Sequence, residues 1–508
     1  MRPTDQKSNN EKHENRQKKY SLKDTLDENV NLFRQIFAND DTLVTRYFEN
    51  QQNNPVKCCI LFIEGMVDNK IVNESIIQPV IQNGQIRNYG DITDILLKQV
   101  IVTNNIEITS DVNTMIQGIT GGDTVLLSDG SSEGLVISSK GWKTRDITEP
   151  QFERSLRGPR EGFTESLQIN LSLIRKKLET PDLKIKYMTL GSQTRTKISI
   201  CYLDSIVNKK ILDEVERRLK DIHTDGILDS GYIQEFIRDT PFTPFYTIGN
   251  TEKPDNVAGK LLEGRVAILS EGSPTALTIP YLFAENFQSS EDYYLNFYLA
   301  SINRILRIIA FFFSISVPAV YVALVTFHQE AIPTPLLLSI SAARQGVPFP
   351  TIVEIIVLLV VFELLREAGV RMPSNIGQAL SIVGALVLGQ ASVEARLVSA
   401  PIVIVVSLTA ITSLMIPRIT GAIIILRLIF LLLSAFIGLY GYLFGMVGLL
   451  ISLCEVRSFG VPYMSQLTNL NPEDIKDIAI RAPWWYLKYR PKLIGRNSVR
   501  QSGGGKSS

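Results

Sequence analysis

Hydrophobic and polar residues are distributed so unevenly that the chain divides into two unlike halves. Residues 1–295 are mixed and charged, whereas residues 303–456 are mostly apolar. The apolar half contains the runs Thr351–Leu365, Ile376–Val393 and Pro401–Ile416. Each run approaches the roughly 20 residues that a helix needs to cross a bilayer core. We therefore predict a helical transmembrane domain over residues 303–456.

The number of membrane segments is predicted to be five or six. A first apolar run covers about residues 308–327, and Gln329–Gln345 fits either a loop or a re-entrant piece. The stretch from Gly421 to Cys454 is too long for one ordinary span. Its spaced glycines permit either a single kinked helix or a hairpin of two helices.

The polar half predicts two small α/β subdomains, at residues 26–147 and 180–295. In the first, Leu26, Val30 and Phe33 recur at helical spacing. We expect a buried strand at Lys57–Ile63 and a pair of strands on either side of the turn that begins at Ser128.

The second subdomain is predicted to open with a hairpin of Leu183–Leu190 and Thr196–Leu203. An amphipathic helix over Ile211–Ile222 and a strand over Arg265–Leu269 should follow. The fold class is thus a multi-domain membrane protein of the α+β/α kind, with two small α/β subdomains followed by an α-helical transmembrane bundle.

A charged segment at residues 148–179 separates the two subdomains. Acidic and basic residues alternate in it, and a helix is expected from about Thr164. We interpret Arg157, Arg160 and Glu161 as contacts between lobes or between subunits of an oligomer. The alternative is an anion site, because an arginine-containing turn precedes the start of a helix.

The two ends of the chain are predicted to be polar tails. Residues 1–25 form a basic tail whose composition favours disorder. Residues 457–508 form a basic cytoplasmic tail, in which Trp484, Trp485 and Tyr486 suit a membrane interface. Basic residues at 304 and 307 precede the first apolar run, which places the first half of the chain in the cytoplasm.

Composition argues against several kinds of chemistry. The net charge of +1 gives no reason to expect a nucleic-acid partner. The cysteines at 58, 59, 201 and 454 are spaced neither like a disulfide framework nor like a zinc site. The three histidines are scattered, and no nucleophile or phosphate-binding motif is apparent. We therefore expect no metal, no cofactor and no enzymatic activity.

The third apolar run is the candidate for a pore. As a helix, it places small residues on one face, where close packing is expected: Gly377, Ser381 and Gly384. The opposite sector carries two valines and two polar residues, which we predict to line the pore or form its gate: Val383, Val387, Gln390 and Glu394. Apolar rings gate channels by dewetting, and carboxylate rings favour cations. The alternative is that the valines only pack and the polar pair bonds to a neighbouring helix.

The second apolar run ends in charges at helical spacing. Glu363, Arg366 and Glu367 are expected to form ion pairs at its cytoplasmic end. A structural role is the first interpretation, and a role in gating is the second.

Three long motifs identify a family resemblance. They are ERSLRGPREGFTESLQINLSLIR at 153–175, EGRVAILSEGSPTALTIPYLFAENFQSSEDYY at 263–294 and FELLREAGVRMPSNIGQALSIVGALVLGQASVEARLVSAP at 362–401. Together they resemble the A subunit of the GerA-type spore germinant receptors over roughly residues 25–490. Small departures occur, such as Glu271-Gly-Ser-Pro where the family often has Asp first.

The resemblance implies a location in the inner membrane of the bacterial endospore. It also implies two partners, a transporter-like B subunit that binds the nutrient germinant and a lipoprotein C subunit. A subunits of the family are thought to assemble into an oligomer that forms a nutrient-gated cation channel, which releases ions from the spore core.

Two other functions remain open from the sequence. One is a receptor scaffold that transmits the signal and conducts nothing. The other is a secondary transporter, although residues 303–366 and 376–456 show no repeat of each other, as many transporter halves do.

Overall fold

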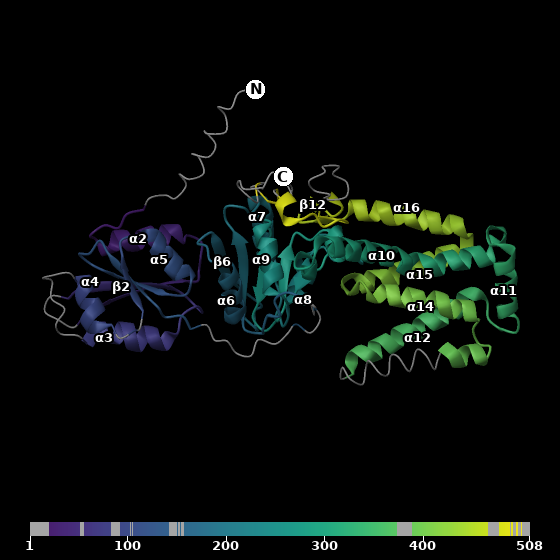
Figure 1. Cartoon of the computed structure of the whole chain (residues 1–508), viewed down its shortest axis with the longest axis horizontal. Coiled ribbons are helices and arrows are strands. Elements are labelled where there is room, and N and C mark those ends of the chain that lie inside the picture. The colour runs from purple at the N-terminus through teal and green to yellow at the C-terminus, as the bar shows by residue number, and fades with distance from the viewer. Residues whose placement is uncertain are drawn as a thin grey trace, which may run out of the picture.

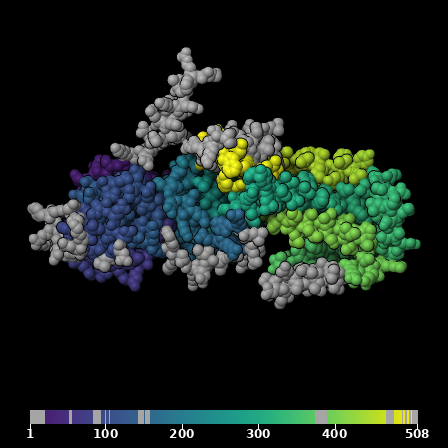
Figure 2. Space-filling model, viewed as in Figure 1, coloured from purple at the N-terminus to yellow at the C-terminus, as the bar shows by residue number. Residues whose placement is uncertain are grey.

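The computed structural model places three parts in a row (Figure 1). Two α/β units lie side by side, and a group of long helices extends from the second unit. In the space-filling view the three parts touch along a continuous surface (Figure 2). The structure describes residues 20–50, 55–82, 92–101, 103, 105–141, 150, 153, 157–372, 389–465, 477–487, 489–490, 494–495 and 499.

The first unit is a five-stranded antiparallel sheet with strand order β1-β2-β4-β5-β3. Its elements are α2 (Leu26–Ile36), β1 (Leu43–Glu49), β2 (Lys57–Ile63), the π-helix Ile71–Ile77, α3 (Gln78–Gln82), α4 (Ile92–Ile95), the π-helix Leu96–Val100, β3 (Ile106–Thr109), α5 (Val112–Thr120), β4 (Thr124–Ser128) and β5 (Gly134–Ile137). The expected helix, buried strand and strand pair are confirmed.

Both faces of this sheet are covered, which explains why β2 is apolar throughout. Ile60 and Phe62 face a core formed with the π-helices and α3. Leu61 and Ile63 face the opposite core, which α2 and α5 complete. Because successive side chains of a strand point to opposite faces, a strand buried on both sides shows no polar alternation.

The second unit has the sheet order β6-β7-β9-β10-β8, again antiparallel. Its elements are α6 (Leu167–Lys177), β6 (Leu183–Leu190), β7 (Thr196–Leu203), α7 (Lys209–Lys220), α8 (Ser230–Ile237), β8 (Gly249–Thr251), α9 (Pro254–Leu262), β9 (Val266–Ser270) and β10 (Ala276–Ile279). Helices α7 and α8 cover one face of the sheet, and α6 and α9 cover the other. The predicted hairpin, helix and strand are confirmed.

The two units repeat one topology. In both, a helix precedes two strands, two helical segments follow, and a strand, a helix and two strands complete the unit. The sheet orders correspond strand for strand. Short sequence traces match as well: Val-Asp-Asn-Lys-Ile at 67–71 corresponds to Val-Asn-Lys-Lys-Ile at 207–211. The sequence prediction missed this duplication because the similarity is confined to such traces.

A buried ion pair joins the two units. Arg175 of α6 contacts the Asp40 carboxylate, and both side chains are almost fully buried. The same guanidinium donates to Thr42 Oγ1 at 3.0 Å. Between the units, the backbone N–H of Asp41 also donates to the carbonyl of Ile185 at 2.9 Å. Removing one partner of a buried pair is costly, so we infer that the units are fixed relative to each other.

Two segments outside the predicted α/β subdomains pack on the second unit. In the segment 148–179, the helix α6 packs on the second sheet through Leu167, Leu171 and Ile174. The segment 457–508 begins with the short strands β11 (Arg457–Ser458) and β12 (Val461–Pro462). Phe459, Val461 and Ile494 then complete the core of the second unit.

The helical part follows two 3₁₀ turns, Phe283–Phe287 and Ser290–Tyr293. Its helices are α10 (Phe297–Thr326), α11 (Thr334–Arg344), α12 (Thr351–Arg371), α14 (Ala400–Leu414), α15 (Thr420–Ile437) and α16 (Leu439–Glu455). Among the described residues, two segments are long and apolar enough to cross a membrane, Phe297–Thr326 and Pro417–Ile437, and α14 and α16 are shorter apolar helices. The count of five or six membrane segments stays a prediction.

The long apolar run after residue 420 forms two helices rather than one. α15 ends and α16 begins at Gly438, whose φ of 68° is unfavourable for residues with a side chain. A Cβ there would lie 2.9 Å from His328 Nε2 and 3.0 Å from Phe327 Cβ. α16 runs back beside α15 toward the second unit (Figure 1). Of the two alternatives, the structure therefore favours the hairpin.

The cysteines differ sharply in their expected reactivity. Burial raises the pKa of Cys58, Cys59 and Cys201 to about 12, whereas Cys454 near the end of α16 is exposed. At pH 8 a thiol with such a pKa is about one part in ten thousand thiolate, which is the reactive form. We expect a maleimide to label the native protein at Cys454 alone, measured by mass spectrometry of peptides. Denaturation should expose the other three, and rapid labelling of native Cys201 would contradict its burial in the second unit.

Candidate functional site

The second unit and the helices meet in a region that we call the junction. It comprises the two 3₁₀ turns after β10, the first turns of α10, the turn between α14 and α15, and residues 456–463. An aromatic core fills it, in which Phe283 packs edge-on against Phe287 and Phe311 with ring centroids 5.3 and 5.9 Å apart. The ends of α14, α15 and α16 that lie at the junction are called their near ends.

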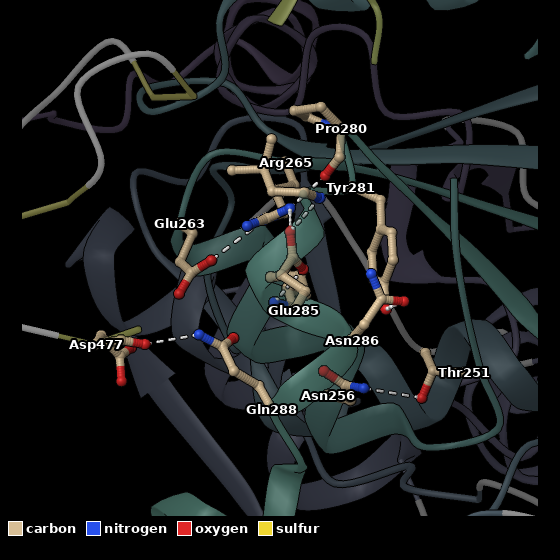
Figure 3. Close-up of polar contacts among 12 residues, drawn as sticks. Thr251, Asn256, Glu263, Arg265, Pro280, Tyr281, Glu285, Asn286, Gln288 and Asp477 are labelled. Carbon is tan, nitrogen blue, oxygen red and sulfur yellow. Dashed lines mark hydrogen bonds and ion pairs between the residues drawn. The ribbon is translucent and has the colours of Figure 1, made fainter. Parts of the chain in front are cut away.

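A buried ion-pair group attaches the first 3₁₀ turn to the sheet (Figure 3). Arg265 lies at the start of β9, and its guanidinium contacts the Glu285 carboxylate at 2.6 Å and Glu263 at 3.2 Å. It also donates to the carbonyl of Pro280. Lys260 of α9 contacts the second oxygen of Glu285 at 2.6 Å. Glu285 therefore connects three segments of the second unit.

A second group attaches α10 to the turn before it. Arg304 is 0 % exposed, and its Nε lies 2.9 Å from Asp292 Oδ2. Arg307, one turn later, donates to both oxygens of Asp292 at 2.9 and 3.0 Å. Asp477 completes the group at 2.7 Å from Arg304 Nη1. The sequence interpretation treated these arginines as flanking charge of a membrane span, and in the structure they also form ion pairs at the junction.

A third group connects the charged segment to the helices. Glu153 contacts Arg418, in the turn between α14 and α15, at 2.6 Å. Its other oxygen accepts hydrogen bonds from Thr251 Oγ1 at 2.5 Å and the backbone N–H of Glu252 at 3.2 Å. Arg418 also donates to the carbonyl of Gln288 at 3.1 Å. A cavity of about 390 Å³ adjoins these groups, lined in part by Lys260, Glu285, Tyr293 and Arg418.

The predicted contact residues of the charged segment lie near the junction. Arg157 and Arg160 are exposed, and Glu161 contacts Lys177 of α6 at 3.0 Å and Lys176 at 3.5 Å. Between the arginines, Gly158 has a φ of 119°, and a Cβ there would lie 2.6 Å from the Tyr294 ring. Within this chain, Glu161 holds the segment to the second unit.

The predicted ion pairs of the second apolar run involve an additional arginine. Glu363 contacts Arg366 at 2.7 Å, whereas Glu367 contacts Arg371 at 2.6 Å. Arg427, in the apolar helix α15, reaches Glu363 at 3.2 Å, and its side chain is only 3 % exposed. Sequence reasoning missed this contact between α12 and α15. The sequence did contain one sign of this contact, which is the single arginine within a long apolar run. A charge in that position needs a partner, because it is costly to leave it unpaired in lipid.

The predicted pore residues are only partly within the described chain. Val383 and Val387 lie outside the described residues, as do the packing residues Gly377, Ser381 and Gly384. Gln390 and Glu394 are described and exposed, and Gln390 Nε2 donates to Glu394 Oε1 at 2.9 Å. The pore interpretation therefore stays a prediction.

A further buried carboxylate stands at the end of the helices distant from the junction. Glu354 of α12 is 1 % exposed, and it accepts a hydrogen bond from the backbone N–H of Ser399 at 2.8 Å. Ser399 is the N-cap of α14, so the carboxylate stabilises the start of that helix. Arg344 of α11 lies 4.0 Å from it. Among the described residues, no group of three or more histidine, cysteine, aspartate or glutamate side chains could hold a metal ion.

Comparisons with known proteins show to which family this chain is related. The family model described as Bacillus/Clostridium GerA spore germination protein matches residues 31–493. The chain is 44% identical to spore germination protein KA of Bacillus subtilis (strain 168) over 471 residues, which cover 92% of this chain and 86% of that protein. It is 36% identical to spore germination protein GerLA of Bacillus cereus over 440 residues, or 86% of this chain and 89% of that protein.

One solved structure is also similar. It is the crystal structure of the N-terminal domain of the A subunit of the Bacillus megaterium spore germinant receptor GerK3, with 34% sequence identity and a TM-score of 0.41. The match covers 52% of this chain and 98% of that one. On the family match and the similarity to whole relatives, this chain belongs to the GerA family of spore germination proteins.

Proposed function

We propose that this protein is the A subunit of a nutrient germinant receptor and that its copies assemble into a ligand-gated cation channel. The channel would lie in the inner membrane of the endospore, with the α/β units on the core side. A transporter-like B subunit would bind the germinant, and a lipoprotein C subunit would complete the receptor. Opening of the channel would release ions from the spore core and start germination.

The junction is the observation that carries this proposal. A buried ion pair joins the second unit to α10 through Arg304 and Asp292, and a partly buried one joins it to the α14–α15 turn through Glu153 and Arg418. Buried charges that remain paired resist separation, because an unpaired partner is costly. A displacement of the α/β units is therefore transmitted to at least three helices, as a receptor that controls a pore requires.

The polar residues of the helical part support conduction rather than anchoring. Glu354, Glu363 and Arg427 lie within apolar helices, where a simple membrane anchor has no use for charge. Gln390 and Glu394 are exposed in the single chain and thus accessible to neighbouring copies or to a water-filled path.

Potassium leak tests the channel directly. The chain is expressed in vegetative bacteria with Val383→Ala, and intracellular potassium is followed without germinant. We expect leak from the variant, because a shorter side chain at an apolar constriction lets water enter. The matched control is Val447→Ala on the exposed face of α16, which should not leak.

The same experiment can also contradict the proposal. Equal membrane levels of both variants and an oligomeric particle in detergent must be established first. If Val383→Ala, Val387→Ala and Gln390→Ala all fail to leak under those conditions, the scaffold function is favoured over the channel. A monomeric particle that exchanges ions would favour a transporter instead.

A further inference from the structure

An uncharged aromatic loop projects from the second unit. It connects α8 to β8, and no charged residue occurs from Thr240 to Asn250. The Phe242 side chain is 99 % exposed, and Tyr246 is 49 % exposed. Pro241 and Pro244 flank the phenyl ring and restrict the backbone, so that little entropy is lost when the loop binds a surface.

The loop is fixed at the level where the helices leave the second unit. Phe245, three residues after Phe242, is buried in the junction with its ring centroid 5.9 Å from that of Phe283. The same core cluster contains Ile416, Ile419 and Val456, which lie at the near ends of α14, α15 and α16. In Figure 1, α8 lies between α9 and the helices, in agreement with this position.

Hydrogen bonds to the segment after α16 hold the loop in place. The Ser458 hydroxyl donates to the carbonyl of Thr247 at 2.6 Å, and the backbone N–H of Phe459 donates to Asp239 at 2.5 Å. Since Ser458 follows the last residue of α16 by only three positions, the base of the loop cannot be far from the end of that helix. The exposed rings therefore stand beside the apolar surface of the helices.

A second set of exposed aromatic residues lies beside the start of α10. Trp484, Trp485 and Tyr486 are 46–60 % exposed, and Trp485 packs edge-on against Phe297, the first residue of α10. Aromatic residues gather at membrane–water interfaces because their rings are apolar and their polar groups tolerate the headgroups. The exposed rings of Phe242 and Tyr246 have the same character.

We propose that the loop 240–247 docks on the lipid bilayer that the helices cross. Phe242 inserts its ring at the boundary between headgroups and acyl chains, and Tyr246 lies among the headgroups. The absence of charge in the loop suits a lipid surface, because insertion then leaves no ion pair to break. The second unit is thereby attached to the bilayer surface itself, in addition to its ion pairs with the helices.

Site-specific fluorescence tests the docking with the full chain in vesicles of phosphatidylglycerol and phosphatidylethanolamine. Phe242→Cys is made in a Cys454→Ser background, because the other three cysteines are buried, and an environment-sensitive fluorophore is attached. We expect blue-shifted emission that is quenched by lipids carrying a nitroxide near the headgroup end of the acyl chain, and that is unaffected by aqueous iodide.

The matched control is Tyr47→Cys, an exposed aromatic position on β1 of the first unit. Its emission should be quenched by iodide and unaffected by the nitroxide lipids. Iodide quenching at position 242 would overturn the proposal, because the ring would then stand in water. Protection from both quenchers would also overturn it, since position 242 would then be covered by another copy of the chain. Phe242 is almost fully exposed, so the substitution does not compromise folding.

Discussion

Exchanging Asp292 for asparagine is expected to lower the free energy of unfolding by about 3 kcal/mol. Asparagine preserves the shape of the side chain, removes its charge and replaces one acceptor oxygen with an N–H donor. Arg304, which is 0 % exposed, then keeps Asp477 as its single carboxylate partner, and Arg307 loses its ion pair with Asp292. The penalty arises because a buried charge without sufficient pairing is far less stable than the same charge in water.

The measurement is the temperature at which half of the detergent-solubilised protein loses its monodisperse elution peak. The control is Arg217→Ala, which breaks only exposed ion pairs on α7 and should leave that temperature unchanged. If Asp292→Asn were as stable as the control, the junction could not depend on this ion-pair group, and the mechanical link between the second unit and α10 would have to be abandoned.

A second large loss of stability is expected from the substitution Glu363→Gln. This substitution leaves Arg427, almost fully buried in α15, without a carboxylate, and Arg366 loses the same partner. Breaking a buried pair by removing one partner costs about 3–5 kcal/mol. We expect the variant to reach the membrane at a lower level and to lose its elution peak at a lower temperature.

A double variant separates charge imbalance from lost packing. Adding Arg427→Met to Glu363→Gln removes the orphaned buried charge and supplies an apolar side chain of similar length. The double variant should regain much of the lost stability, whereas Arg427→Met alone should be milder than Glu363→Gln alone. If the double variant were no better than Glu363→Gln, the contact between α12 and α15 would not be electrostatic in origin.

Local patterns predicted much of the fold but few of its long-range contacts. Apolar periodicity located α2, β6, β7 and α7, because each of these elements buries a face that its own sequence displays, and a continuous apolar run located β2. The role of α6 was not apparent, since its charged surroundings concealed the apolar face that packs on the second sheet. The pairing of Glu363 with Arg427 spans 64 positions, and no local pattern specifies such a partner.

The ion pairs of the junction were the contacts that the sequence predicted least well. Arg304 and Arg307 precede an apolar run, and basic residues in that place ordinarily report membrane orientation. Their pairing with Asp292 depends on a 3₁₀ turn which positions the carboxylate under α10. Likewise Arg418 meets Glu153 across 265 positions, so only the assembled fold brings the two together.

The duplication of the α/β unit has one asymmetry with a consequence for how the protein is made. In the first copy, Val67 forms a β-bridge with Lys140, three residues after the end of β5. In the second copy the corresponding Val207 pairs with Gly495, from beyond the last helix. The ribosome therefore delivers the piece that finishes the second copy only after every helix has been synthesised. In a chain whose helices fail to insert correctly, the core of the second unit lacks Phe459, Val461 and Ile494. Its apolar residues then stay exposed, and cellular proteases can recognise them.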